Sequence, residues 1–256
     1  NHKHAIEIWK YIKEHDKGIT KFHYEVAADL LNEEELELIE SMRPGLIQLE
    51  IGVQSTNEQT IREIRRTMRF EEVARIVQRI NQGENVHQHL DLIAGLPYEG
   101  MESFQKSFDD VYRLHPEQLQ LGFLKVLKGS YMESQKERYG LVYKSRPPYE
   151  VLYTNWLSYE EMMRLKSVEE MVEVYYNSGQ FSYCLRKLEE EYASPFVLYQ
   201  ELGRYYENHE LHLMSHSRIT RYEILLGFVR EKHKERERLY RELLTFDLYF
   251  RENVKN

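Results

Sequence analysis

Apolar residues are spaced in two different ways along this chain. The first half alternates between the two spacings, and the second half keeps one of them. In the first half, short apolar runs alternate with segments in which apolar residues recur every three or four positions. Short runs are typical of buried strands, and the longer period is typical of amphipathic helices. The pattern predicts strands over residues 22–28, 46–55, 86–94 and 119–127, and helices over residues 5–14, 32–42, 70–81 and 101–114.

The connections between these strands predict a parallel sheet. Strands separated by helices of 10–15 residues form βα units, in which neighbouring strands run in the same direction. Asn32 and Asn57 are suited to cap the helices that follow them, and Pro44-Gly45 ends the helix before it. Four strands are too few to close a six- or eight-stranded barrel. Because the chain also begins without a Met, we expect earlier strands to precede it.

The second half has a different character. After Arg146-Pro147-Pro148 glycine and proline are sparse, and the helical period dominates from Tyr149 to Asn256. We expect helices over residues 159–176, 181–192, 195–208 and, as one or two long helices, 219–250. The predicted fold class is α/β followed by all-α: an incomplete parallel (β/α) barrel over residues 1–145 and a helical domain over residues 146–256.

Composition narrows the function classes. The chain of 256 residues is 41% hydrophobic and 30% charged, which is typical of a globular protein. No apolar run reaches the roughly 18 residues of a membrane span, and no secretory signal is present. We therefore expect a cytoplasmic protein with no membrane partner. The net charge of −8 argues against a general nucleic-acid surface.

The single cysteine, Cys184, excludes an internal disulfide and any metal cluster held by several thiolates of this chain. Its neighbours in Phe181-Ser182-Tyr183-Cys184-Leu185 follow a helical pattern. We expect a buried structural thiol.

Two strand ends carry the most specific signals. Leu-Glu-Ile-Gly-Val-Gln-Ser at residues 49–55 and Asp-Leu-Ile-Ala-Gly-Leu-Pro at residues 91–97 each end a strand in small or polar residues. Such positions face the active-site mouth of a parallel barrel. Both motifs resemble signature strands of the radical S-adenosylmethionine (SAM) enzymes. The resemblance covers about residues 1–145 and corresponds to the third to sixth strands of that partial barrel.

The closest resemblance is to the branch with the oxygen-independent coproporphyrinogen oxidases, the tRNA methylthiotransferases and the B12-binding radical SAM proteins. In the last group a helical domain of unknown function often follows the barrel. The resemblance implies that Glu25 approaches SAM, that Gln54 with its neighbour Ser55 lies beside the ribose, and that Arg66 pairs with the SAM carboxylate. A guanidinium fork suits a carboxylate, and an amide suits ribose hydroxyls.

The resemblance also implies an adenine site. Gly95-Leu96 matches the fifth-strand motif, where a glycine permits close approach of the backbone. Leu127 lies in the sixth-strand segment bordering the adenine. Family members hold a [4Fe–4S] cluster through a CxxxCxxC loop after the first strand, and this chain has no such loop.

These implications lead to two hypotheses. The first is a fragment of a radical SAM enzyme that is inactive alone, retains neither SAM nor the [4Fe–4S] cluster, and needs the N-terminal remainder of the same polypeptide. Cobalamin use is possible in the parent protein, and its substrate, small or macromolecular, stays open. The alternative is a cluster-free α/β scaffold or partner-binding module with no catalytic activity.

Other polar residues admit two interpretations each. Asp91 and Glu50 fit either a buried hydrogen-bonded carboxylate or a site residue, and His87 with His89 could face a substrate from one strand. A metal site at His209, His212 and His216 would require them to share one helical face. A stripe of tyrosines in the second half fits core packing better than a docking surface. The mixed charges of residues 230–238 indicate a solvated helix with internal ion pairs.

Overall fold

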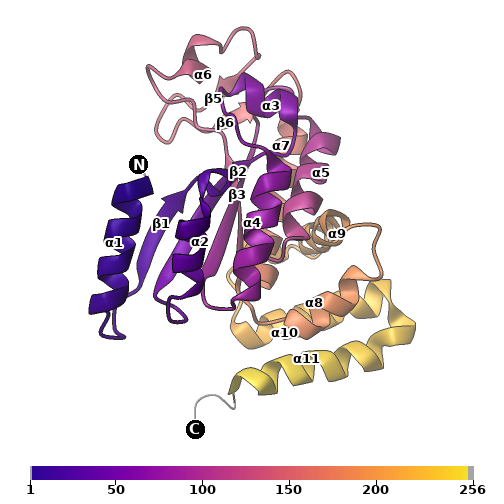
Figure 1. Cartoon of the computed structure of the whole chain (residues 1–256). Helices are drawn as coiled ribbons and strands as arrows, with labels where there is room; N and C mark the ends of the chain where they lie inside the picture. The colour runs from indigo at the N-terminus through magenta and orange to yellow at the C-terminus, as the bar shows by residue number, and fades with distance from the viewer. Residues whose placement is uncertain (1, 253–256) are drawn as a thin grey trace. The chain divides into compact units, whose positions relative to one another are not determined.

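The computed structural model describes residues 2–252 and contains two compact units, one ending at Met162 and the other beginning at Met163 (Figure 1). Residues 146–162 therefore pack with the first unit. The domain boundary after residue 145 stays a prediction, since compactness alone does not define a domain. Among the described residues, no helix is both long and apolar enough to cross a membrane.

A four-stranded parallel sheet forms the centre of the first unit, as the sequence predicts. Its strands pair in the order of the chain: β1 (Phe22–Val26), β2 (Ile47–Gln54), β3 (His87–Ala94) and β4 (Gln118–Phe123). β4 ends four residues earlier than predicted. The reason is that the chain turns: Leu124 still donates to the Ala94 carbonyl, but its own carbonyl accepts from Val151.

One helix precedes β1, and the others connect the strands. They are α1 (His2–His15), α2 (Glu33–Glu40), the short α3 (Glu58–Glu63), α4 (Phe70–Gln82) and α5 (Met101–Tyr112). Both predicted caps are present. The Asn32 side chain accepts from the Glu35 amide in a capping box, and Asn57 accepts from the first amides of α3. The 3₁₀ turn Ala28–Leu30 replaces the end of the first predicted strand.

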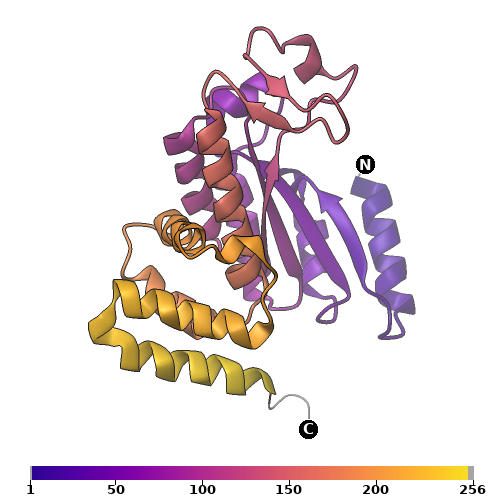
Figure 2. The ribbon, with the colours of Figure 1, turned by 180° about the vertical axis from the view of Figure 1, so that it is seen from behind.

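The sheet has two chemically different faces, because successive side chains of a strand point to opposite sides. One face is apolar and packs under α4 and its neighbours. Gln88, buried on this face, donates to the Val77 carbonyl and the Asn81 amide oxygen of α4. We call the opposite face, turned toward the viewer in Figure 2, the polar face. It consists of His23, Glu25, Gln48, Glu50, Gly52, His87, His89, Asp91, Gln118 and Gln120.

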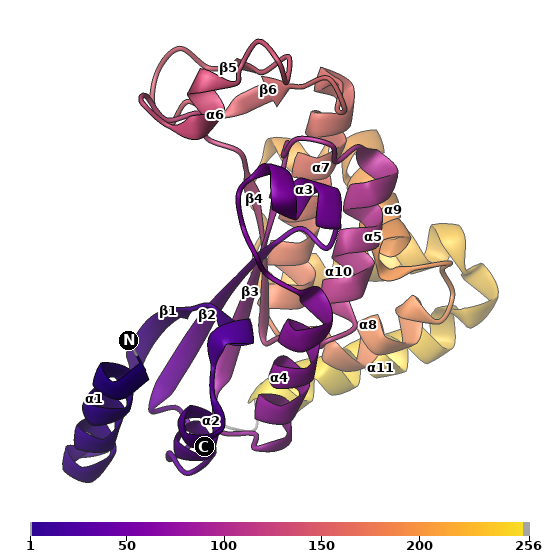
Figure 3. The same ribbon diagram turned by 45° about the horizontal axis from the view of Figure 1, so that its top comes forward.

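A small antiparallel element follows the sheet. α6 (Tyr131–Ser134), β5 (Val142–Tyr143) and β6 (Val151–Tyr153) lie beyond the carboxyl ends of the parallel strands (Figure 3). The expectation of an all-helical chain from Tyr149 onward is therefore wrong at β6. A strand of three residues is too short to show a period in the sequence.

The second unit is helical, as predicted. α7 (Tyr159–Met171) enters it and continues as a π-helical turn over Val172–Asn177. The remaining helices are α8 (Ser182–Glu189), α9 (Pro195–Asn208), α10 (Arg218–Lys232) and α11 (Glu237–Glu252). The charged run therefore divides between two helices around His233. The tyrosine stripe is largely core: Tyr175, Tyr199 and Tyr206 are buried, whereas Tyr183 is 38% exposed.

Cys184 is a buried thiol of α8, as predicted, and burial raises its pKa. The carboxylate of Asp247, on α11, lies nearby and provides hydrogen-bond acceptors for the first backbone amides of α8. Asp247 accepts from the backbone amides of Tyr183 and Cys184, each at 3.0 Å. A carboxylate at a helix N-terminus satisfies donors that have no partner within the helix.

Removing this cap should destabilise the second unit. We expect Asp247→Ala to lower the free energy of unfolding by about 1–3 kcal/mol, because two buried amide donors lose their acceptor. Urea denaturation followed by circular dichroism measures the change. The control is Glu207→Ala, at an exposed position of α9. Equal losses in both variants would contradict a capping role for Asp247.

Candidate functional site

The carboxyl end of β2 contains a tight and uncommon turn. Gln54 has φ of 68°, and the Ser55 amide donates to the Val53 carbonyl at 2.9 Å across it. A bond spanning two residues around a positive φ is the pattern of a classic γ-turn, which is rare and strained. The pairing of β2 with β3 shifts register at the same point. Strained backbone of this kind persists where surrounding contacts hold it, and often at functional sites.

The turn brings two predicted SAM contacts together over Gly52. A Cβ at Gly52 would lie 2.5 Å from Nε2 of Gln54 and 3.5 Å from Nη1 of Arg66. The amide and the guanidinium therefore converge above the one position of β2 that has no side chain. Sequence reasoning missed Gly52, although its place in the Gly-Val-Gln-Ser motif was a signal that could have identified it.

Carboxylates from neighbouring strands surround this point. Asp91 of β3 is in register with Gly52, and Glu25 of β1 is in register with Glu50 of β2. Burial, the charge of Glu50 and a hydrogen bond with it, and the charge of Glu25 raise the pKa of Asp91 to about 7. A carboxyl with this pKa can either donate or accept a hydrogen bond near neutral pH.

Histidines line the same face. His23 Nε2 lies 2.8 Å from Glu50 Oε2, and His89 Nε2 lies 3.1 Å from Asp91 Oδ1. The latter two atoms are close, but neither makes a well-directed hydrogen bond within the described part of the chain. Burial lowers the pKa of both His87 and His89, so each favours the neutral imidazole. Of the predicted histidine pair, the structure thus places His89 beside Asp91.

Ser55 lies in a buried polar cluster directly after the turn. Its hydroxyl donates to Oε1 of Glu99 at 2.6 Å, and Ser107 donates to the same oxygen at 2.8 Å. Burial raises the pKa of Glu99 to about 7, although the serine hydrogen bonds oppose the shift. Sequence reasoning missed Glu99, which follows Pro97-Tyr98 without a distinctive spacing.

The remaining predicted residues lie around the carboxyl edge of the sheet. Gly95 follows β3 with φ of 91°, and a Cβ there would lie 2.6 Å from Cγ1 of Val151. The space beside its α-carbon is therefore filled by this chain. Leu96 is buried, whereas Leu127 is 54% exposed. Glu25 is exposed on the polar face. SAM contact by each of these residues stays a prediction.

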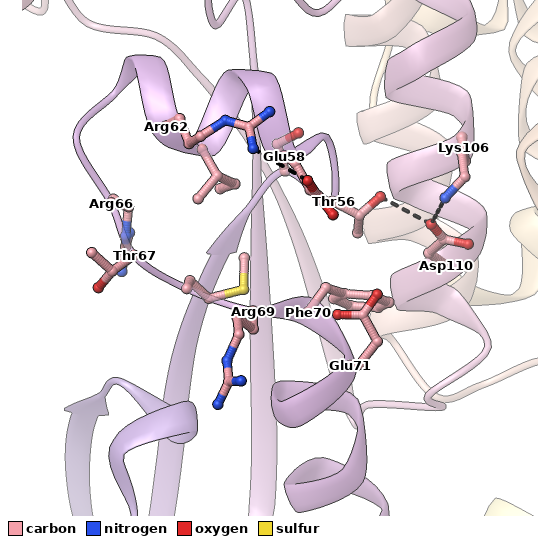
Figure 4. Close-up of a pocket in the computed structure, with 13 residues that line it drawn as sticks. Thr56, Glu58, Arg62, Arg66, Thr67, Arg69, Phe70, Glu71, Lys106 and Asp110 are labelled. Carbon is pink, nitrogen blue, oxygen red and sulfur yellow. Dashed lines mark hydrogen bonds and ion pairs between the residues drawn. The ribbon is translucent and has the colours of Figure 1, made fainter.

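A pocket of about 500 Å³ adjoins the outer side of the same turn (Figure 4). Thr56, Arg66, Arg69 and Phe70 lie around it, and Lys106 pairs with Asp110 along one wall. Arg66 thus stands between this pocket and the polar face.

A metal site at the three histidines, which the sequence disfavours, lacks the shared helical face that it would require. α9 ends at Asn208, so His209, His212 and His216 follow the helix and do not share one of its faces. Within residues 2–252, no group of three or more His, Cys, Asp or Glu side chains is arranged to hold a metal ion.

Family models match two separate parts of the chain. Residues 1–111 match the radical SAM superfamily, and residues 137–256 match a protein family of unknown function, DUF4080. The resemblance that the strand-end motifs carry is thereby confirmed. Comparison with curated proteins finds no match.

Several solved structures are similar to part of the chain. Coproporphyrinogen III oxidase from Escherichia coli, a radical SAM enzyme, is 21% identical with a TM-score of 0.41; 48% of this chain and 28% of that chain are covered. The radical SAM methyltransferase TsrM from Kitasatospora setae, with tryptophan and a SAM analogue bound, is 15% identical with a TM-score of 0.45; coverage is 56% and 29%. The archaeal Elp3 from Methanocaldococcus infernus is 18% identical with a TM-score of 0.38; coverage is 45% and 27%. The chain thus spans less than a third of the length of each.

The buried carboxyl of Glu99 should make stability depend on pH. In the unfolded chain it ionises near 4.5, and in the folded chain near 7. Between these values the folded state binds more protons, so the free energy of unfolding falls as pH rises and levels off above about 7. The shift corresponds to up to about 3 kcal/mol.

Glu99→Gln should remove this contribution, which urea denaturation at pH 5 and pH 8 measures. Glu102→Gln, at an exposed position of α5, should leave the slope as it is in the parent chain. Asp91, whose pKa is also raised, contributes the same pH dependence of stability in the parent chain and in both variants. Its contribution therefore cancels when their slopes are compared. An unchanged slope in Glu99→Gln would refute the assignment.

Proposed function

We propose that this chain, whose residues 1–111 carry the radical SAM superfamily match, supplies the ribose, adenine and carboxylate contacts of a SAM site and part of the substrate wall. The parent enzyme would complete the barrel with the N-terminal remainder of the polypeptide. The observation that carries the proposal is the convergence of the Gln54 amide and the Arg66 guanidinium over Gly52, beside Asp91.

The residues present fit SAM. Arg66 forms no ion pair within the described part of the chain, and its planar fork suits the methionine carboxylate of SAM. Gln54 and Asp91 provide amide and carboxyl groups for the ribose hydroxyls. The missing side chain at Gly52 leaves the space that the flexible end of Gln54 occupies, with the Arg66 guanidinium beside it. In this superfamily SAM supplies radical chemistry, and the protein supplies binding and orientation.

The residues present do not fit a [4Fe–4S] cluster. The chain has one cysteine, which is buried in α8, and burial raises the pKa of its thiol. A cluster needs several exposed thiolates. The proposal therefore assigns the cluster loop to the N-terminal remainder, and no step of the reaction is assigned to the cluster here. Cobalamin is bound in one TsrM structure, and its use by the parent of this chain stays open.

The polar face is the part of the proposed site that remains for a substrate. His89 and His23 are each within 3.1 Å of a carboxylate oxygen, and a neutral imidazole such as that of His89 can accept or pass a proton. These histidines do not identify the substrate class, and fold-level similarity does not identify a substrate either.

Titration of the isotopically labelled chain with SAM tests the proposal. Since the site is incomplete, we expect weak binding, which nuclear magnetic resonance can measure. Signals of the Gln54 side-chain amide and the Arg66 guanidinium should shift with SAM, together with the backbone amides of Gly52 and Asp91. Shifts scattered over the surface, or confined to the second unit, would refute the proposed site.

A methyl group at Gly52 should weaken SAM binding without unfolding the sheet. Gly52→Ala would push away the flexible end of Gln54, so we expect a loss of roughly tenfold in affinity, in line with the loss of one good polar contact. Gly122→Ala is the matched control on β4, because its Cβ would lie no closer than 3.4 Å to any neighbour. Equal affinities of the two variants would contradict the role of Gly52.

The alternative function, a cluster-free scaffold, is favoured by the single buried cysteine. On either function we expect no iron–sulfur absorbance after reconstitution of the 256-residue chain with iron and sulfide. Site-localised SAM binding separates the two, because a scaffold has no reason to bind SAM at Gln54. A stable brown protein with cluster bands would contradict the assignment of the cluster to another segment.

A further inference from the structure

The carboxyl of Glu99 lies where two loops of the first unit meet. It is fully buried between the end of β2 and the start of α5, and its Oε1 accepts from the hydroxyls of both Ser55 and Ser107. Its Oε2 has no hydrogen-bond partner within the described residues. Burying a carboxyl group costs free energy unless hydrogen bonds with neighbouring groups compensate for the lost contact with water.

The two serines pass this constraint to the backbone. Because each hydroxyl donates to Glu99, its lone pairs are free to accept. Ser55 Oγ accepts from the Asn57 amide at 2.9 Å, and Ser107 Oγ accepts from the Thr56 amide at 3.0 Å. One carboxyl oxygen thus orients two acceptors for consecutive backbone amides, directly after the γ-turn at Gln54.

Further contacts tie the same two loops together. The Asn57 side chain donates to the Tyr98 carbonyl and to Ser103 Oγ, and Thr60 donates to the Pro97 carbonyl. The loop after β3 and the start of α5 are therefore hydrogen-bonded at several points to the segment after β2. Glu99 is the only ionisable side chain among these contacts.

We propose that Glu99 is a positioning residue for the SAM site: by orienting the Ser55 and Ser107 hydroxyls, it holds the γ-turn that directs Gln54 toward the polar face. This inference rests on the proposed function, because it assigns Gln54 a ligand to meet. A residue with a positive φ at the centre of a γ-turn returns readily to a common backbone conformation once its flanking contacts are lost. Glu99 itself touches no ligand in this account.

The first test measures the turn without any ligand. Hydrogen exchange of the Thr56 and Asn57 amides should accelerate roughly tenfold in Glu99→Leu, because both acceptor hydroxyls lose their orientation. Glu99→Gln keeps an acceptor oxygen and should retain the protection. Ser107→Ala provides a milder disruption if the Leu variant does not fold. The control is Glu102→Leu, at an exposed position of the same helix.

The second test measures whether the effect reaches Gln54. Glu99→Leu should weaken SAM binding roughly tenfold, a loss typical of disturbed positioning groups. In a Gln54→Ala background the same substitution should cost less than about twofold, because the route through Gln54 is already lost. A residue that only supports folding would show additive losses and equal acceleration of all sheet amides.

The outcomes separate the two proposals. If Thr56 and Asn57 keep their protection in Glu99→Leu, or if protection falls uniformly across the sheet, the positioning role is overturned. If the exchange result holds but the parent chain shows no site-localised SAM shifts, the proposed function fails and Glu99 is left as an anchor of the turn alone.

Discussion

The parallel register of four strands is the constraint on which the rest of the first unit depends. Because neighbouring strands stay in register up to the shift between β2 and β3 at the Gln54 turn, residues of like orientation form rows across the sheet, such as Glu25, Glu50, His89 and Gln118. Burying the apolar rows under the helices forces the polar rows to the other side. The face that the helices cannot cover is therefore the face that carries the titratable groups.

That arrangement has an electrostatic consequence. Glu25, Glu50 and Asp91 lie close together on the polar face, and burial, together with the charges of Glu50 and Glu25, raises the pKa of Asp91 to about 7. Burial lowers the pKa of the nearby His89 imidazole, which therefore favours its neutral form. A site of this kind offers both hydrogen-bond donors and acceptors at neutral pH. This is a physical reason to expect polar ligands along it.

Backbone strain is concentrated at the edge of the same site. A γ-turn at a non-glycine residue costs about 1–3 kcal/mol, and the hydrogen bonds of Ser55, Thr56 and Asn57 offset this cost. Glu99 in the loop after β3 and Ser107 of α5 provide the partners of Ser55 and Thr56, so the two signature strands are physically coupled at their ends. Motifs 40 residues apart in the sequence thus form one unit in the fold.

The sequence by itself determined the four parallel strands, the principal helices, the buried cysteine and the resemblance of its first part to the radical SAM superfamily. These features depend on local periods, caps and motifs, which are written in consecutive residues. Its resemblance to the superfamily also marked Gln54 and Arg66 as SAM contacts. Only the tertiary structure showed that they meet over Gly52, that β5 and β6 follow the sheet, and that Glu99 anchors the turn. Those facts depend on contacts between residues distant in the chain and on a left-handed backbone at Gln54, which no local pattern reveals.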